Sequence, residues 1–232
     1  MGLLLDRGQR GLLVGRTGSG KSANAYFQLR HPKVWPVIMF DTKIEDEFFG
    51  VPQEGDSLEL VESLDAFDKL AKRPKNKMPD YILVRPGIDE MQDHEYLDQY
   101  ARLAYEKFGP VFLYFDELYS WHNNGRVGNN MTAILTRGRS KGKTFLGTTQ
   151  RPSWISRFFM TEADKFYIHQ LTDERDKSTL ANVIPGLAKL PDLPEYHFYH
   201  YNVKKPRDGI MPFAPVPYKP PAEIKVDPIQ WI

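Results

Sequence analysis

The hydrophobic residues of this chain fall into short runs, and most runs end at a glycine, a proline or a charged side chain. Continuous apolar runs of this length are typical of buried strands. They predict strands over residues 12–14, 34–40, 81–84, 111–115, 144–149 and 165–169. Helical spacing of apolar residues between the runs predicts helices near residues 21–31, 61–71, 96–108, 130–137, 154–163 and 173–184. Residues 50–60 are polar and carry glycine and proline, so we expect a loop there. This alternation predicts an α/β fold with a central, mostly parallel sheet flanked by helices.

The C-terminal part of the chain has a different pattern. Residues 196–203 alternate aromatic and polar side chains, which is typical of an edge strand. Seven prolines then lie between Pro206 and Pro228, with large hydrophobic residues interleaved up to Trp231 and Ile232. This segment is too rich in proline for a sheet and too hydrophobic for a free linker. We therefore predict one folded domain over residues 1–203 and an extended proline-rich arm over residues 204–232, which covers either its own core or a neighbouring protein.

Composition restricts the class of protein. The chain has 232 residues, of which 41% are hydrophobic, enough for one α/β domain with a sizeable core. The 31 basic and 30 acidic residues give a net charge of +1, so any contact with DNA must be local. The absence of cysteine excludes disulfides and thiolate metal sites. No apolar run approaches the roughly 20 residues of a membrane span, and about ten residues precede the first motif, so we expect a soluble protein without an N-terminal anchor.

The first motif is a glycine-rich turn between a predicted strand and a predicted helix. Gly15, Gly20, Lys21 and Ser22 match the P-loop pattern G-x-x-x-x-G-K-S/T. Backbone N–H groups of such a loop bind phosphate, the lysine reaches the β and γ oxygens, and the hydroxyl of Ser22 would ligate Mg²⁺. A chance glycine-rich turn is the alternative, but the flanking strand and helix favour a nucleotide site. The predicted ATP-binding residues are Gly15, Arg16, Thr17, Gly18, Ser19, Gly20, Lys21, Ser22 and Ala23.

The second motif ends the apolar run 111–115. The two acids that follow it, Asp116 and Glu117, match a Walker B strand. Asp116 would hold the Mg²⁺ shell, and Glu117 would polarise the attacking water. The alternative is a core strand that ends in two acids by chance.

Two polar segments follow. Residues 118–130 contain Trp121 and Arg126, an aromatic and a cationic side chain that could follow a phosphate backbone, so we predict both as DNA contacts. A merely mobile loop is the alternative, and the basic turn at residues 72–77 is a rival DNA site. Residues 137–143 form the most cationic run in the chain and contain Arg137 and Arg139.

The order of these motifs resembles that of the FtsK/HerA superfamily of ring-forming DNA-pumping ATPases. The resemblance rests on the P-loop, a strand that ends with Asp41 and Lys43, the Asp116–Glu117 strand, the arginine-bearing turn, and a strand that ends at Gln150. It covers roughly residues 8–170, and without an additional domain the chain is most similar to the genome-packaging ATPases of tailless icosahedral viruses with an internal membrane. Thr42 replaces the proline that the family places between Asp41 and Lys43.

The resemblance implies a RecA-like (ASCE) P-loop core that uses ATP and Mg²⁺. It also implies that the strand carrying Gln150 lies between the P-loop strand and the Walker B strand, so that Gln150 senses the γ-phosphate. Arg137 or Arg139, the latter slightly favoured, would be an arginine finger that reaches a neighbour's ATP. The implied partners are double-stranded DNA, further copies in a hexameric or pentameric ring, and capsid vertex proteins. The implied locations are the host cytoplasm during assembly and then the packaging vertex of the virion.

We therefore expect an ATPase motor that moves viral DNA into a preformed capsid. Three alternatives remain open: another FtsK/HerA-type pump, as in conjugation or filamentous-phage assembly; a P-loop nucleotide kinase; and a vertex structural protein that binds nucleotide without turnover. A kinase would hold an acceptor in place of the water-activating Glu117. The related pumps commonly carry membrane segments or accessory domains.

Overall fold

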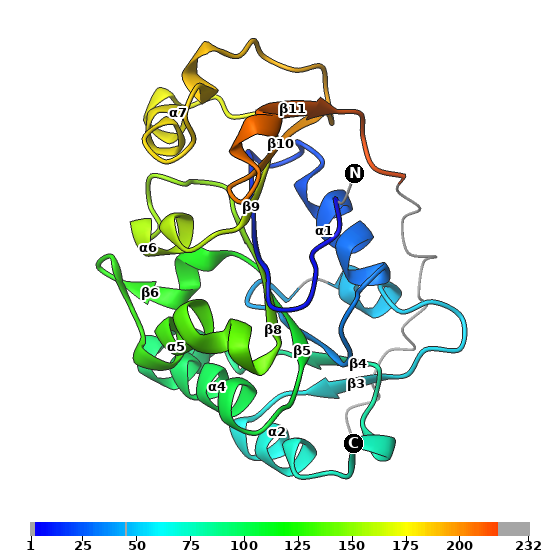
Figure 1. Cartoon of the computed structure of the whole chain (residues 1–232). Coiled ribbons are helices and arrows are strands. Elements are labelled where there is room, and N and C mark those ends of the chain that lie inside the picture. The colour runs from blue at the N-terminus through cyan, green and yellow to red at the C-terminus, as the bar shows by residue number, and fades with distance from the viewer. Residues whose placement is uncertain (1–2, 45, 218–232) are drawn as a thin grey trace.

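A nine-stranded sheet forms the centre of the molecule (Figure 1). The computed structural model describes residues 3–44 and 46–217. The strand order is β11-β10-β9-β1-β8-β5-β2-β4-β3, and the strands from β9 to β3 are parallel to one another. The strands are β1 (Arg10–Val14), β2 (Val37–Phe40), β3 (Leu58–Val61), β4 (Tyr81–Val84), β5 (Val111–Phe115), β8 (Lys143–Thr149), β9 (Lys165–Ile168), β10 (Phe198–Asn202) and β11 (Ile210–Phe213). A separate hairpin contains β6 (His122–Asn123) and β7 (Arg126–Val127). The predicted α/β fold with a mostly parallel sheet is confirmed.

Helices cover both faces of the sheet. They are α1 (Lys21–Arg30), α2 (Leu64–Ala71), α3 (Ile88–Gln92), α4 (His94–Glu106), α5 (Asn129–Arg137), α6 (Arg157–Thr161) and α7 (Glu174–Ala181). Helix α1 lies on one face, and α2, α4 and α5 lie on the other (Figure 1). None of the helices within the described ranges combines the length and hydropathy needed to span a bilayer.

Strand β5 shows why the apolar runs are continuous. Val111, Leu113 and Phe115 pack into the core that contains α2, α4 and α5. Phe112 and Tyr114 point the other way, into the core under α1. Since successive side chains of a strand alternate between faces, a strand covered on both faces needs apolar residues at every position.

Two predicted boundaries are wrong on the β3 side of the sheet. Residues 58–61, expected to be loop or helix, form β3, and α2 begins only at Leu64. Strand β3 pairs with β4 alone, and Leu60 remains 38% exposed, so the strand carries little of the apolar pattern that marks a buried one. Strand β2 begins at Val37, directly after Pro36, rather than at residue 34.

The C-terminal prediction needs a larger correction. Strand β10 is not an edge strand, because it lies between β9 and β11. Residues 210–213 form the outermost strand of the sheet, β11, although they include a proline. This residue, Pro212, pairs with Tyr199 of β10. Proline is tolerated there because one side of an edge strand makes no ladder hydrogen bonds. Residues 218–232, most of the predicted arm, lie outside the described residues, and the division at residue 204 stays a prediction.

Candidate active site

The P-loop connects the carboxyl end of β1 to α1. The backbone N–H of Gly15 donates to Thr149 O at 3.3 Å, and that of Arg16 donates to Gln170 O at 2.9 Å, so the loop is fixed to the two strands beside β1. A Cβ on Gly15 would lie 2.6 Å from His169 Cβ, which excludes any other residue. Gly20 has a φ of 89°, a left-handed conformation that glycine adopts without strain, just before the first turn of α1.

A cleft of about 600 Å³ opens at this point. Its lining includes Gly18, Gly20, Lys21, Ser22 and Ala23. Lys21 is buried and Ser22 is exposed. A helix N-terminus with a buried lysine beside it favours a phosphate group, because N–H dipoles and the ammonium charge converge there. The residues predicted from the P-loop pattern are thus brought together.

His169 supports the P-loop, and the sequence analysis did not identify it. Its Nδ1 lies 3.0 Å from Ser19 O, which can only accept, so Nδ1 carries the proton; its Nε2 lies 3.2 Å from the Asn24 amide nitrogen and accepts from it. Burial lowers the pKa of His169 to about 4, and the nearby charge of Lys21 acts in the same direction. The imidazole is therefore neutral at neutral pH. Its position at the end of the strand beside β1 is the only sequence signal that could have found it.

The two Walker B acids are connected by one hydroxyl. Thr148 Oγ1 donates to Asp116 Oδ1 at 3.0 Å and accepts from the backbone N–H of Glu117 at 3.1 Å. The Tyr114 hydroxyl donates to the same Asp116 oxygen at 3.1 Å. Burial, together with the charge of Asp116, raises the pKa of Tyr114 well above its ordinary value, so the tyrosine remains a donor. Glu117 has a φ of 53°, a conformation that is rare for a non-glycine residue and that its neighbours must hold.

The ammonium of Lys43 lies beside both Asp116 and Glu117. Its Nζ lies 3.1 Å from Asp116 Oδ2 and 3.9 Å from Glu117 Oε2. Asp41 is fully buried and ion-paired with Arg85 at 2.9 Å. Its other oxygen accepts from the backbone N–H groups of Lys43 and Ile44. Asp41 therefore shapes the turn, and Lys43 is the member of the pair that reaches the site.

The site fits Mg²⁺. Asp116 Oδ2 is buried and, apart from the ion pair with Lys43, makes no hydrogen bond within the described ranges. A carboxylate oxygen with spare acceptor capacity is a suitable ligand for a hard cation, as is the hydroxyl of Ser22. No cluster of three or more His, Asp or Glu side chains able to hold a metal occurs in residues 3–44 and 46–217. The rest of the shell would therefore come from phosphate and water oxygens, which is how Mg²⁺ is commonly held.

Gln150 lies beside the P-loop. The hydroxyl of Thr17 donates to Gln150 Oε1 at 2.7 Å. Strand β8, which Gln150 follows, lies between β1 and β5. The predicted strand order is confirmed, and the γ-phosphate sensing role stays a prediction.

Arg137 and Arg139 lie far from this site. They precede β8, whereas the P-loop and Gln150 lie at its carboxyl end. The seven residues of β8 span about 20 Å at roughly 3.3 Å per residue. Lys143, from the same cationic run, is buried, and its Nζ donates to Ala104 O at 2.8 Å and Gly109 O at 2.9 Å. It therefore caps the end of α4 and is not part of a surface cluster.

The predicted DNA loop contains one contact that is wrong. Trp121 is only 4% exposed, with its ring centroid 4.7 Å from that of Phe115 and 5.2 Å from that of Phe40. A 3-10 turn, Leu118–Trp121, folds the chain back over the core, so this tryptophan is a core residue. Arg126 is exposed on the β6–β7 hairpin, as a DNA contact requires. The segment is thus an ordered hairpin and not an irregular loop.

Two other aromatic side chains are exposed beside the hairpin. Tyr119 and Trp154 are 55% and 56% exposed, with ring centroids 6.0 Å apart. The Arg151 guanidinium lies 4.6 Å from the Trp154 ring and pairs with Asp176 at 2.8 Å. The sequence analysis missed Trp154, although it follows closely on the predicted strand that ends at Gln150.

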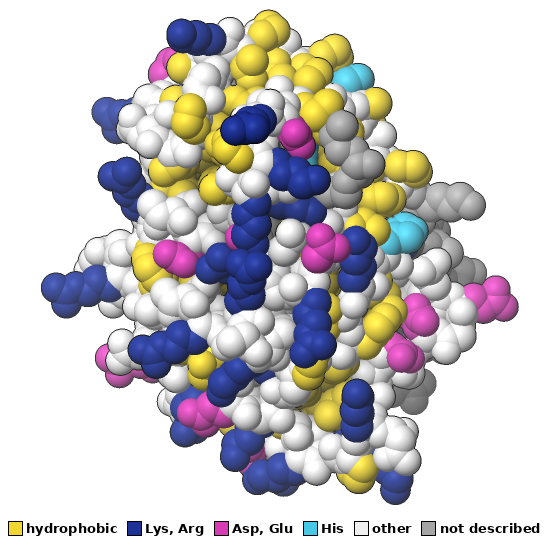
Figure 2. All heavy atoms as spheres, in the orientation of Figure 1, with side chains coloured by type: hydrophobic (Ala, Val, Ile, Leu, Met, Phe, Trp, Pro, Cys, Tyr) yellow, Lys and Arg dark blue, Asp and Glu magenta, His cyan; other side chains and the backbone are white. Residues whose placement is uncertain are grey.

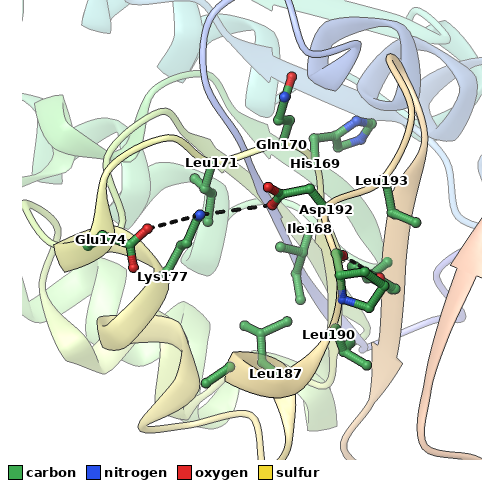
Figure 3. A pocket seen from close by; sticks show the side chains of 13 residues that line it. Ile168, His169, Gln170, Leu171, Glu174, Lys177, Leu187, Leu190, Asp192 and Leu193 are labelled. Carbon is green, nitrogen blue, oxygen red and sulfur yellow. Dashed lines mark hydrogen bonds and ion pairs between the residues drawn. The ribbon is translucent and has the colours of Figure 1, made fainter.

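A second hollow, of about 370 Å³, lies between the end of β9 and α7 (Figure 3). Four leucines contribute to its lining, namely Leu171, Leu187, Leu190 and Leu193. Lys177 lies 3.0 Å from Glu174 and 3.9 Å from Asp192, so its charge is balanced by acids within the hollow. Phosphate is therefore favoured in the P-loop cleft and not here.

Comparisons with known proteins identify relatives of this chain and of its fold. No family model matches the chain. The DNA packaging ATPase P9 of Enterobacteria phage PRD1 is 30% identical over 220 residues, which cover 90% of this chain and 88% of that protein. The genome packaging NTPase B204 of Sulfolobus turreted icosahedral virus 2, solved with ATP-gammaS, superposes with a TM-score of 0.70 at 20% identity, covering 91% of this chain and 100% of that one. ATPases 2 and 3 of EssC from Geobacillus thermodenitrificans superpose with a TM-score of 0.51 at 14% identity, covering 84% and 38%.

Proposed function

The chain belongs to the family of viral DNA packaging ATPases that includes P9 of phage PRD1, and on that premise we propose that it hydrolyses ATP to move double-stranded viral DNA into a preformed capsid. The observation that carries the proposal is the network around Thr148, whose single hydroxyl connects Asp116 to the backbone of Glu117. Thr148 lies on β8, and Gln150, which directly follows this strand, accepts a hydrogen bond from Thr17 of the P-loop. The phosphate-binding and water-activating elements are thereby held as one unit.

In this proposal the triphosphate of ATP binds the backbone N–H groups of the P-loop and the ammonium of Lys21. Ser22 and Asp116 would hold Mg²⁺, which when bound neutralises charge on the phosphate oxygens. Glu117 orients the attacking water and takes its proton. The left-handed backbone at Glu117 and the bond from its N–H to Thr148 fix the direction of that carboxylate. Positioning of this kind supplies much of the rate enhancement in phosphoryl transfer.

Two variants with different expected defects test the proposal. Lys21→Ala removes the charge partner of the phosphate, so both ATP binding and phosphate release should fall. Glu117→Gln keeps the shape and removes the base, so ATP should still bind while hydrolysis stops. Phosphate release is measured with and without double-stranded DNA, and ATP binding is measured by calorimetry.

Three outcomes would contradict the proposal. Phosphate transfer that starts only when a nucleoside monophosphate is added would indicate a kinase. ATP binding without any turnover would indicate a structural nucleotide clamp. Full activity of Glu117→Gln would show that Glu117 is not the base that activates the water.

We further propose that the β6–β7 hairpin contacts the DNA backbone. Arg126 is exposed there, and Asn123, Asn124 and Gly125 at the turn are exposed with it. The neighbouring Tyr119 and Trp154 add an aromatic surface. Because backbone phosphates carry no sequence information, binding should be salt-dependent and nearly independent of sequence.

Finally, we propose that the motor is a ring, a hexamer or a pentamer, and that Arg137 or Arg139 acts on a neighbour's ATP. Both arginines are exposed and make no ion pair within the described ranges. Lys and Arg side chains are spread along the middle of the face seen in Figure 2, with Asp and Glu side chains between some of them. The distance of both arginines from their own P-loop supports action on a neighbour and not within the chain. Docking of the ring on capsid vertex proteins, after assembly in the host cytoplasm, completes the proposal.

A further inference from the structure

We propose that the nucleobase of ATP stacks on Tyr196 in the cleft beside the P-loop, which Pro215 and Val216 also line. The inference rests on the proposed function, since it concerns the same ATP. It adds a binding subsite that the P-loop motif does not define. It also gives a role to the start of the proline-rich segment.

The two walls of the cleft come from opposite ends of the chain. One wall is the phosphate-binding segment from Gly18 to Ala23, and the other consists of Tyr196, Pro215 and Val216. Tyr196 lies close to the phosphate end, because a Cβ on Gly20 would be 3.3 Å from its ring. A nucleotide whose phosphates occupy the P-loop therefore has an aromatic ring within reach of the rest of the molecule.

Tyr196 is held in an unusual position. Its φ is 62°, which is rare for an aromatic residue and is kept only where the surroundings impose it. The next residue closes a turn through a hydrogen bond from His197 N–H to Pro194 O at 3.2 Å. The side chain is 49% exposed, so a large apolar ring faces the solvent beside the cleft. A stacked base would cover this ring, which is favourable because bases stack well on aromatic side chains.

The sheet also positions Pro215 and Val216, which share this wall with Tyr196. Phe213, the last residue of β11, stacks on Phe198 with ring centroids 5.6 Å apart. Val216 packs against the core under α1. These contacts bring Pro215 and Val216 into the lining of the cleft, where they add apolar surface to the site.

The lining has few groups that could distinguish one base from another. Lys21 and Ser22 belong to the phosphate end. His169 also lines the cleft, but both of its ring nitrogens are already bonded, to Ser19 O and to Asn24. Stacking does not depend on the pattern of donors and acceptors on the base edge, so ATP and GTP should bind within about tenfold of each other.

The test compares ATP with inorganic tripolyphosphate, which has the phosphates but no base. Affinities are measured by calorimetry on the full chain with Mg²⁺ present. Tyr196→Ala should weaken ATP binding about tenfold or more and leave tripolyphosphate binding within about twofold. Tyr196→Phe keeps the ring and should bind ATP nearly as well as the original chain. Ile88→Ala, which truncates an exposed side chain on α3, is the control and should change neither affinity.

The outcomes separate this inference from the proposed function. Equal weakening of both ligands by Tyr196→Ala would mean that the P-loop itself was disturbed, and unchanged ATP binding would place the base elsewhere; either result overturns the stacking site. A preference for ATP over GTP far above tenfold would show that the site recognises the edge of the base, and would contradict the expectation that it does not. If the original chain binds neither ATP nor tripolyphosphate, the proposed function fails and the base site fails with it.

Discussion

Replacing Thr148 with valine tests whether one hydroxyl coordinates the two Walker B acids. Valine has nearly the same shape as threonine but neither donates nor accepts a hydrogen bond. The substitution removes the bond to Asp116 Oδ1, at 3.0 Å, and the bond from the Glu117 N–H, at 3.1 Å. Thr148 is 2% exposed, so water cannot easily replace either bond.

The loss can be estimated from these two bonds. A hydrogen bond to a charged group contributes about 1.5–3 kcal/mol, and a neutral one about 1 kcal/mol. The free energy of unfolding should therefore fall by about 2–4 kcal/mol. Glu117 also loses a contact that holds its left-handed backbone. A carboxylate displaced by about 1 Å from the attacking water can reduce the rate by about 100-fold. We expect kcat to fall by about 10- to 100-fold while the affinity for ATP stays unchanged.

Thr144 is the matched control on the same strand. It is also buried, and its hydroxyl also makes two bonds, accepting from the Gly8 N–H at 3.0 Å and donating to Asp6 O at 3.4 Å. It lies at the opposite end of β8 from the site. Thr144→Val should lose stability, as measured by urea unfolding, but hydrolyse ATP at the original rate. If both valine variants lose stability and both retain full kcat, the Thr148 hydroxyl does not position Glu117.

Three further predictions address DNA, assembly and pH. Arg126→Ala should reduce DNA-stimulated hydrolysis while leaving basal hydrolysis nearly intact, as measured over a range of salt concentrations. If neutralising the basic residues of 72–77 abolishes the stimulation and Arg126→Ala does not, the DNA site lies at that turn. Rings that mix Arg139→Ala subunits with Glu117→Gln subunits should recover part of the ATPase activity, because at one type of interface an intact Arg139 meets an intact Glu117. Mixed rings without activity would exclude a finger acting between subunits. Burial, with the charge of Lys165, lowers the pKa of His200 to about 4 from 6.5. The unfolded chain therefore takes up the proton first, so stability should fall by up to about 3 kcal/mol as the pH drops from 6.5 to 4, and His200→Leu should flatten that slope in thermal melts.

The sequence predicted those parts of the site whose residues lie close together along the chain. A P-loop needs its glycines, lysine and serine within a few consecutive residues, so the pattern and its place between β1 and α1 are visible in the sequence. The same holds for Asp116 and Glu117, which follow a run that is apolar because helices cover both faces of β5.

The parts that the sequence did not predict depend on contacts between distant segments. The polar neighbours of Trp121 suggested that it lies in a loop. The 3-10 turn instead places its ring against Phe40 of β2, which is distant in the sequence. Lys143 follows two arginines, yet it is buried because the carbonyl groups at the end of α4 bind its ammonium. His169 became part of the site only because β9 pairs with β1. None of these pairings leaves a periodic or local signal.

The burial of Trp121 also affects how hydrolysis could move DNA. Its ring contacts Phe115 and Phe40, so residue 121 is fixed to the carboxyl ends of β5 and β2. His94 Nδ1 lies 3.0 Å from Ser120 O and fixes the preceding residue to α4. Because residues 120 and 121 are fixed in this way, a rearrangement at Glu117 can displace only the few residues before them. The β6–β7 hairpin should therefore move together with the core of its own subunit. In the proposed ring, movement of Arg126 relative to DNA would then require movement of the whole subunit relative to its neighbours. An arginine that reaches from one subunit to the next one's ATP is suited to drive such movement, which is why the mixed-ring experiment tests the motor as well as the finger.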